Sequence, residues 1–302
     1  MALILSEEQK LLKDSATEFL AMNAPVEQFR DLRDNNYKAF DESLWTKIVE
    51  MGWTALTIPE EFDGLEFGYV GLGQILEEMG KNLTKAPLFS SIVLGANVLT
   101  HSKNQELKKE WLPQLMEGTK RVALALDEHT YFDPTAIATT AKSTANGYTL
   151  SGKKTMIIDG ASADAFIVVA KTEDEELALF IVAADSKGIT VTSDVLLDAG
   201  TYATVIFDQV AVTATNRISG AGEGAALLNH ILNTASICLS AEMLGMVTEA
   251  FGQTVAYLKE REQFGKRIGT YQALQHRAAI MFSEIELCKS IVIQALQALD
   301  SD

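Results

Sequence analysis

Between Gly224 and Gln263 the sequence contains no proline, and Gly245 and Gly252 are its only internal glycines. Because these two residue types interrupt helices, the segment predicts one helix that is about 60 Å long at 1.5 Å per residue. The segment Tyr271 to Ala298 predicts a second long helix, antiparallel to the first because the loop between them is short. Two such amphipathic helices cannot cover their own apolar stripes, so they need further helices from this chain or another copy.

The break between the two helices reads FGKRIG, in which Gly265 and Gly269 flank Lys266 and Arg267, and Arg261 precedes it. Glycine lets a backbone come close to a ligand or another chain. Guanidinium groups suit phosphate oxygens. The break therefore predicts either a corner that grips a phosphate-bearing cofactor or a solvated helix–loop–helix corner, and charge alone favours the second.

The first 119 residues predict a helical domain. Ser6 and Gln9 form a capping-box pattern ahead of a helical apolar stripe. The other expected helices are Asp41 to Met51, Tyr69 to Leu83, Pro87 to His101 and Gln105 to Met116.

The pattern changes to short apolar runs after Gly118, separated by turn signals such as Asn146-Gly147 and Asp159-Gly160. Many short strands without intervening helices predict a small β sandwich or barrel. The expected strands are Val122 to Leu126, Tyr148 to Leu150, Lys154 to Ile158, Phe166 to Ala170, Leu177 to Ala183 and Thr204 to Phe207. The expected fold is a multidomain α+β protein with a helical domain at 1–119, a β domain at 120–221 and an incomplete four-helix bundle at 222–302.

Composition narrows the class of protein. The chain has 302 residues, 47% of them hydrophobic, which is enough for two or three packed units. A formal charge of −16 argues against a nucleic-acid surface, which needs clustered lysine and arginine. We expect no apolar run of membrane-spanning length and no signal-peptide core in Met1 to Leu5. Cys238 and Cys288 are expected to be buried thiols of a reducing compartment, so the cytoplasm is the default location.

A longer match covers the corner. Residues Arg261 to Arg277 read R-x-Q-F-G-x-x-I-x-x-x-Q-A-x-x-H-R, which resembles the signature of the acyl-CoA dehydrogenases, flavoproteins that introduce a double bond beside a thioester. Other segments follow the family's order. SEEQKLLKDSATEFL resembles its first helix, and LTIPEEFDGLEFGYVGLGQILEEMGKNL resembles its P-E-x-x-G-G loop and the next helix. YTLSGKKTMIIDGASAD resembles the N-G-x-K-x-W-I-T-N-G segment of its middle β domain.

The resemblance implies FAD as the cofactor, lying between the middle β domain of one subunit and the long helices of its neighbour. Carried over by motif, Arg261, Gln263 and Phe264 would contact the adenosine and pyrophosphate part of a neighbour's FAD. Gln272 would do the same from the next helix. The family's helical domain normally continues beyond this point, so its C-terminal part is expected to be absent here. The exposed apolar faces then predict association with other chains.

The flavin-facing half of the family site is matched poorly. Leu126 stands where the family has a threonine whose hydroxyl points at the flavin ring, and Phe132 stands where a serine helps to hold the acyl-CoA. Met156 and Ile158 replace the tryptophan and threonine of the W-I-T segment, and both are equally expected as strand core. Backbone N–H groups could still serve the flavin. The lost contacts, at about 1 kcal/mol each, predict much weaker FAD binding.

The sequence shows no catalytic base at the family positions. Removal of the α-proton of a thioester needs a carboxylate near that carbon. The family's glutamate usually lies in the part absent here, and some members place it at the position of Ala235. Ser236 replaces an arginine that often follows, a degenerate substrate position, and Glu242 is the internal acid nearby, expected more as a packing or ion-paired residue than as a relocated base. Glu77 and Glu78 match family acids, and we expect helix-surface or structural roles for them. The four histidines show no metal-ligand spacing.

Two functions follow. The first is an acyl-CoA dehydrogenase that oxidises an acyl-CoA between its α and β carbons with FAD as hydride acceptor and passes electrons to an electron-transfer flavoprotein. The second is a non-catalytic partner subunit that lends the cross-subunit half of the FAD site to a paralogous dehydrogenase. The AEMLG and FGKRIGTYQALQHRAA stretches resemble the branch of steroid side-chain dehydrogenases built from two dissimilar subunits. Homo-oligomers and hetero-oligomers both stay open, and neither nucleic acid nor membrane is an expected partner.

Overall fold

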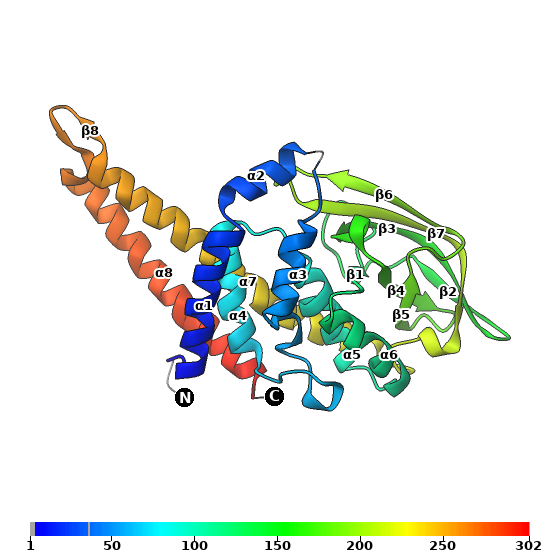
Figure 1. Cartoon of the computed structure of the whole chain (residues 1–302). Coiled ribbons are helices and arrows are strands. Elements are labelled where there is room, and N and C mark those ends of the chain that lie inside the picture. Colours follow the sequence, from blue (N-terminus) through cyan, green and yellow to red (C-terminus); the bar gives the residue numbers. More distant parts are fainter. Residues whose placement is uncertain (1–3, 36, 302) are drawn as a thin grey trace. The chain divides into compact units, whose positions relative to one another are not determined.

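The chain folds into two compact units, and a computed structural model describes them for residues 4–35 and 37–301 (Figure 1). One unit contains the residues up to Phe29, the segment Phe67–Thr84 and the residues from Ser236 onward. The other contains Arg30–Glu66 and Lys85–Ala235. The predicted fold class, with helices first, then a β region and then two long helices, is confirmed. The three domain boundaries given above stay a prediction.

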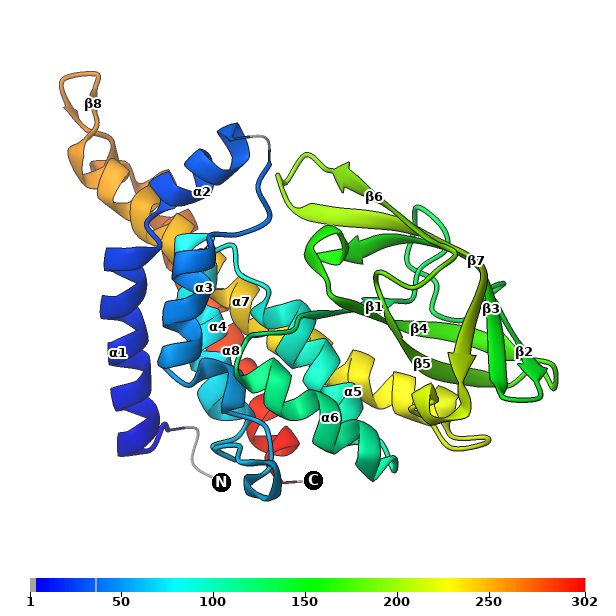
Figure 2. The same ribbon diagram turned by 45° about the vertical axis from the view of Figure 1, so that its right-hand side comes forward.

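The two long helices expected from the sequence are present. α7 runs over Gly224–Glu260 and α8 over Gln272–Leu299, side by side and joined by a short turn (Figures 1 and 2). α4 (Tyr69–Asn82) packs against this pair in the first unit. α4 and α7 approach backbone to backbone, because a Cβ on Gly80 would lie 2.0 Å from the carbonyl oxygen of Glu242. Only glycine fits such a contact.

Polar side chains fix the ends of the helices in the first unit. α1 (Glu7–Asn23) begins with the predicted capping box between Ser6 and Gln9. α4 has no cap of its own, and the carboxylate of Asp300 accepts hydrogen bonds from the first backbone N–H groups of α4, including that of Val70 at 3.0 Å. The end of α8 thus satisfies donors that the helix geometry leaves unpaired.

The β region of the second unit is one curled seven-stranded sheet (Figure 2). Its spatial order is β1-β4-β2-β3-β7-β6, with β5 also paired to β4. β4 runs parallel to β1 and β2, and the other pairings are antiparallel. The strands are β1 (Val122–Ala125), β2 (Thr140–Thr144), β3 (Gly147–Ile158), β4 (Ala165–Thr172), β5 (Leu177–Ala183), β6 (Ile189–Val195) and β7 (Thr201–Thr213).

The inside of the curled sheet forms an apolar core around the aromatic rings of Phe166, Phe180 and Phe207. The outward residues of β1 and β4, such as Leu124 and Ile167, are also buried. Burial on both faces explains why these strands appear in the sequence as unbroken apolar runs. β2 is mostly polar, β6 mixes apolar and polar residues, and both are largely exposed, so neither appears in the sequence as an unbroken apolar run.

Among the helices of the second unit, α3 and α6 match expected segments, α2 was not expected, and one further segment differs in type. The segment expected as a helix from Pro87 to His101 is a buried π-helix, η3 (Phe89–Ala96), followed by a short α5 (Asn97–Thr100). The side chains of Ser90 and Ser91 bond to the sheet region, which holds η3 in place. The remaining helices are α2 (Val26–Asp34), which crosses both units, α3 (Glu42–Glu50) and α6 (Gln105–Met116), with short 3-10 turns η1 (Trp53–Ala55), η2 (Glu60–Phe62), η4 (Gly160–Ser162) and η5 (Ala214–Asn216).

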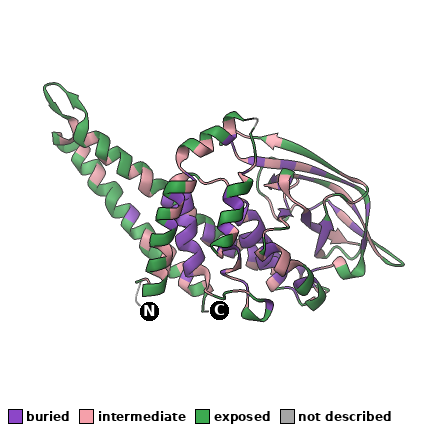
Figure 3. Ribbon diagram, viewed as in Figure 1, coloured by how far each residue is buried: buried purple, intermediate pink, exposed green. Residues whose placement is uncertain are grey.

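Two expectations about the long helices are wrong. Cys238 is buried as expected, but Cys288 is exposed on α8. α7 contains an 18-residue window of mean hydropathy 1.3, so by length and composition alone it is apolar enough to cross a membrane. The core helix of a soluble protein meets the same criteria of length and hydropathy, so this one helix does not by itself indicate a membrane span. Much of α8 and of the C-terminal half of α7 is exposed (Figure 3).

Candidate functional site

The predicted cofactor residues fall into two groups that belong to different units. Arg261, Gln263, Phe264 and Gln272 lie in the first unit, at the corner between α7 and α8. The flavin-facing positions, at the end of β1 and in β3, lie in the second unit. Each group is described below in its own unit.

The corner is a small β-hairpin rather than an irregular break. β8 (Glu262–Gln263) pairs antiparallel with β9 (Lys266–Arg267), and Phe264 and Gly265 form the turn between them (Figure 1). Both turn residues have positive φ, 55° and 77°, as two-residue hairpin turns require. A phenylalanine rarely adopts this conformation, which costs about 1–2 kcal/mol. Phe264 is 92% exposed.

Cationic groups gather on this hairpin. Lys259, Arg261, Lys266 and Arg267 outnumber the two neighbouring acids, on a chain whose formal charge is −16. Arg261 is exposed, and its carbonyl oxygen accepts the N–H of Ile268 at 2.8 Å, which closes the hairpin. The 3-10 turn η6 (Ile268–Thr270) leads into α8. The corner is thus a locally positive, projecting element suited to an anion.

The amide side chains predicted to join the corner are also available. Gln272 is the first residue of α8 and is exposed. Gln263 is exposed, and its side chain donates to the carbonyl oxygen of Glu262 at 2.7 Å. Lys266 lies over the ring of Tyr271, with its Nζ 4.3 Å from the ring centroid. The structure therefore brings the four predicted corner residues together on one small surface, while their contact with FAD stays a prediction.

The flavin-facing positions are mostly apolar, as the sequence indicated. Leu126 follows β1 and is 4% exposed. Met156 sits in a bulge of β3, where the register with β7 shifts, and has a φ of 54°. Ile158 is 39% exposed at the end of the same strand, and Phe132 is exposed in the loop after β1. These four side chains offer no hydrogen-bond donor to a ligand.

A buried ion pair lies directly beside these positions, and the sequence reasoning missed it. The Nζ of Lys154 lies 2.7 Å from Oε1 of Glu128 and 2.8 Å from the carbonyl oxygen of Leu126. Glu128 also accepts the backbone N–H groups of Ala138 and Thr139. Burial lowers the pKa of Lys154 to about 8. This pair ties the end of β1 and the loop after it to β3, so it shapes the surface that Met156 and Ile158 present.

Asp127 is a half-buried acidic residue next to the predicted flavin-facing position Leu126. Its Oδ1 is buried without a hydrogen-bond partner in the described structure, and burial raises the pKa of its carboxyl group. Its carbonyl oxygen accepts the backbone N–H of Thr155 at 2.7 Å, and the predicted flavin-facing residues Leu126 and Met156, next to Asp127 and Thr155 in sequence, are apolar. An apolar surface with one carboxyl group lacks the hydroxyl and ring that the family uses there. The side chains at the predicted flavin-facing positions therefore offer the ring no polar contact, whereas the cations and amides of the corner are groups that suit phosphate oxygens.

A second polar group in this region supports a prediction about pH. Asp159 stands at the asparagine of the N-G-x-K-x-W-I-T-N-G segment and accepts a hydrogen bond from Ser90 at 2.7 Å. Burial raises its pKa from an ordinary 3.8 to about 6. The folded state therefore keeps a proton that the unfolded chain has lost, and the stability this contributes fades as the pH rises from about 4 through 6.

Replacing Asp159 by asparagine is expected to raise the free energy of unfolding at pH 7.5 by about 1–2 kcal/mol. The amide keeps an oxygen for Ser90 but carries no buried charge. At pH 4, where the aspartate is already protonated, the two proteins should unfold alike. Urea titrations at both pH values would measure this, and an equal gain at pH 4 and pH 7.5 would contradict the buried charge as its cause.

The positions considered for the base and the acyl-CoA lie on α7. Ser236 is exposed, and its carbonyl oxygen accepts the hydroxyl of Ser240 at 2.7 Å. Ala235 is buried and carries no acid. Glu242 is half-buried where the backbone of α7 meets Gly80 of α4, a packing position. A catalytic role for Glu242 has no support from this geometry and stays untested.

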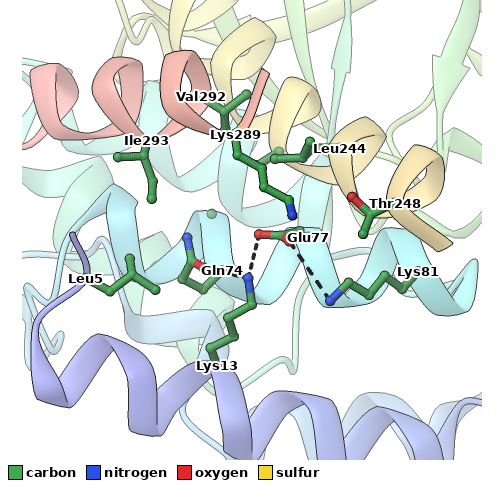
Figure 4. A pocket seen from close by; sticks show the side chains of 12 residues that line it. Leu5, Lys13, Gln74, Glu77, Lys81, Leu244, Thr248, Lys289, Val292 and Ile293 are labelled. Carbon is green, nitrogen blue, oxygen red and sulfur yellow. Dashed lines mark hydrogen bonds and ion pairs between the residues drawn. The ribbon is translucent and has the colours of Figure 1, made fainter. Parts of the chain in front are cut away.

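Glu77 and Glu78 are not surface residues, contrary to one reading of the sequence. Both are buried in α4, and Figure 4 shows Glu77 between Lys13 and Lys81. The Nζ of Lys13 lies 2.7 Å from Glu77, and the Nζ of Lys81 lies 2.6 Å from Glu78. A pocket of about 250 Å³ opens beside Glu77, with Lys289 of α8 on its far wall. The cluster joins α1 to α4 by charge, which supports the structural role.

The fold and the corner define a class of protein before any relative is considered: a helical and β protein that presents a cationic hairpin at the end of two long helices. Three domain families match in the same order. Acyl-CoA dehydrogenase, N-terminal domain, matches residues 6–119, the middle domain matches 124–210, and the C-terminal domain matches 222–302. The chain belongs to the acyl-CoA dehydrogenase family.

Individual relatives agree. Acyl-CoA dehydrogenase FadE27 of Mycobacterium tuberculosis is 30% identical over 269 residues, covering 89% of this chain and 70% of that protein. The mitochondrial isovaleryl-CoA dehydrogenase of Pongo abelii is 29% identical, covering 98% of this chain and 73% of that protein. The ChsE4–ChsE5 complex of Mycobacterium tuberculosis contains a chain that superposes with a TM-score of 0.91 at 26% identity, covering 100% of this chain and 80% of that one.

Proposed function

We propose that this chain is a subunit of a FAD-dependent acyl-CoA dehydrogenase assembly and that its corner binds the phosphate half of a FAD held by another chain. The observation that carries the proposal is the geometry of the corner. Arg261, Gln263, Phe264 and Gln272 share one exposed, cationic hairpin, and their described contacts are local to it. A strained and fully exposed phenylalanine is better explained by a contact outside the chain than by any role inside it.

The β region supports the role of a lending subunit. Its flavin-facing positions carry no donor, and no acid occupies the family position at Ala235. A chain that keeps the cross-subunit half of a site and lacks the other half suits a mixed oligomer with a paralogous dehydrogenase. Two solved relatives are named by two components each: the ChsE4–ChsE5 complex, and the Tcur3481–Tcur3483 steroid ACAD, which superposes with a TM-score of 0.87 at 29% identity.

Within such an assembly each corner residue has a physical task. The guanidinium group of Arg261 would neutralise and orient the pyrophosphate, and the amides of Gln263 and Gln272 would donate to the remaining oxygens. The ring of Phe264 would pack on the adenosine and exclude water. FAD, when bound, supplies the hydride acceptor for oxidation of an acyl-CoA between its α and β carbons. Electron-transfer flavoprotein is the expected acceptor of the electrons, and the cytoplasm is the expected location.

A second candidate is that the chain itself oxidises an acyl-CoA. The specific observation in its favour is that all three family domains match along the chain, including the middle domain at 124–210. Backbone N–H groups near the bulge at Met156 could then hold the flavin. This candidate requires that the purified chain alone gains flavin absorbance on addition of FAD and turns over an acyl-CoA.

Substituting Arg261 by alanine is expected to weaken FAD binding by the mixed complex about 10–100-fold, because a charge-assisted hydrogen bond to phosphate contributes about 1.5–3 kcal/mol. The complex is prepared by co-expression with a paralogous dehydrogenase and titrated with FAD by fluorescence. Arg33→Ala, an exposed arginine on α2, serves as the matched control. Unchanged FAD affinity in the Arg261 variant would rule out the lending role.

A further inference from the structure

The pocket beside Glu77 lies between four helices of the first unit, and we call it the Glu77 pocket. It has a volume of about 250 Å³, and α1, α4, α7 and α8 all contribute to its walls. α4 and α7 meet there backbone to backbone, because a Cβ on Gly245 would lie 1.8 Å from the carbonyl oxygen of Glu77. The pocket is therefore set by the packing of helices inside one unit and not by their outer faces.

Three lysines from three helices converge on the Glu77 pocket. Figure 4 shows the side chains of Lys13, Lys81 and Lys289 directed toward Glu77. The Nζ of Lys13 lies 2.7 Å and the Nζ of Lys81 4.0 Å from the carboxylate oxygens of Glu77. Among the described residues that line the pocket, Glu77 is the only acid, so the lining carries more positive than negative charge. On a chain with a formal charge of −16, such a surface favours an anion.

Two further acids pair with these lysines from outside the lining. Glu78 accepts a hydrogen bond from Lys81 at 2.6 Å, and Glu286 accepts one from Lys289 at 2.6 Å. Each ammonium group has three N–H donors, so both lysines keep donors for an acceptor inside the pocket. Glu286 is exposed, and water screens its charge. Three lysines then face the two glutamates of α4, which suits one additional negative charge rather than two.

The hydroxyl of Thr248 indicates the same ligand chemistry. Its Oγ1 is buried and has no hydrogen-bond partner within the described structure. Thr248 follows Gly245 by about one turn of α7, and Gly245 lies against the backbone of Lys81, so Thr248 and Lys81 belong to the same end of the pocket (Figure 4). Buried polar groups almost always have a partner. One carboxylate group has enough acceptor sites to bond Thr248 and both lysines at once.

The other end of the Glu77 pocket is apolar. Leu5 and Ile293 line it there, opposite Thr248 in the view of Figure 4, and Leu244 adds to the apolar wall. At about 30 Å³ for each water-sized group, the pocket holds about eight non-hydrogen atoms. A carboxylate on a short aliphatic chain therefore matches the size of the pocket, its charge and its two unlike ends.

We propose that the Glu77 pocket binds a small aliphatic monocarboxylate, with its carboxylate on Lys81, Lys289 and Thr248 and its chain against Leu5 and Ile293. The pocket uses none of the corner residues, so this proposal goes beyond the flavin role. The two claims can fail separately.

Isothermal titration calorimetry of the purified 302-residue chain tests the proposal with three probes that share one six-carbon chain: hexanoate, hexan-1-ol and hexylammonium. Hexanoate should bind with a Kd of about 1 mM or lower, and at least about 10-fold more tightly than the other two, because its hydrogen bonds to lysine are charge-assisted. Equal binding of all three would show that the apolar walls alone hold the chain. No binding of hexanoate would show that the pocket holds water only. Either result would overturn the proposal.

Two substitutions locate the bound hexanoate. Lys289→Met should weaken its binding about 5–10-fold, and Thr248→Val, which keeps the shape but removes the hydroxyl, about 3–10-fold. Lys10→Met is the matched control, because Lys10 pairs with Glu7 three residues before it, as Lys289 pairs with Glu286, but lies outside the pocket. With all variants folded by circular dichroism, unchanged binding in both pocket variants, or an equal loss in the control, would place hexanoate elsewhere and refute the assignment.

Discussion

Replacing Lys154 by methionine is expected to lower the free energy of unfolding by about 3–5 kcal/mol, the usual cost of removing one partner of a buried ion pair. Lys154 is fully buried, and its ammonium group holds both Glu128 and the carbonyl oxygen of Leu126. Methionine fills a similar volume but leaves the carboxylate of Glu128 without its cation. Urea unfolding followed by circular dichroism measures the loss.

The neighbouring residue provides the control for this change. Lys153 is exposed on the same strand, so Lys153→Met should change stability by less than about 0.5 kcal/mol. The double variant Lys154→Met with Glu128→Gln should lose much less than the sum of the two single changes, because neither charge is then left alone. Additive losses would show that the two side chains do not act as a pair.

The second large effect is expected at Glu78. Glu78→Ala should cost about 3 kcal/mol of stability, the lower end for a broken buried pair. The carboxylate is 1% exposed, but its partner Lys81 is 24% exposed and can turn toward water after the change. In the Glu78→Ala variant Lys13 still pairs with Glu77, at 2.7 Å in the present structure, which further limits the loss of stability.

The exposed acid Glu7 on the neighbouring helix α1 provides a control that shows whether burial or charge alone makes Glu78 stabilising. Glu7 pairs with Lys10 on α1 at 2.9 Å, and its side chain is 86% exposed. Exposed pairs contribute about 0–1 kcal/mol, so Glu7→Ala should have a small effect. Thermal unfolding of both variants provides the comparison. If both lost the same stability, the buried cluster of α4 would not be the cause.

The helical part of the fold was readable from the sequence because its signals are local. The absence of proline from Gly224 onward predicted α7, and the box of Ser6 and Gln9 predicted the start of α1. The two missed strands are β2, which is mostly polar, and β6, which mixes apolar and polar residues; they pair with β3 and β7. Each pairs with the strand that follows it in the sequence, and a strand without an apolar run is recognised only through that pairing.

The candidate site likewise has a part that could be predicted from the sequence and a part that could not. The corner residues are close in sequence, so their spacing alone placed them together. The pair of Lys154 and Glu128 joins residues 26 positions apart, and only the fold brings them into contact. Lys154 lies in a strand that also contains Lys153 and Thr155, so its sequence context did not mark it as buried. The hairpin turn at Phe264 could not be foreseen, because phenylalanine disfavours the positive φ that it adopts there.

The central claim is that the corner serves a flavin held by a different chain. Native mass spectrometry that keeps FAD bound tests it most directly, applied to this chain alone and to its complex with a paralogous dehydrogenase. We expect no FAD on the chain alone, one FAD for each pair of unlike chains, and loss of that FAD with Arg261→Ala. One FAD on every copy of the isolated chain, retained in the Arg261→Ala variant, would contradict it.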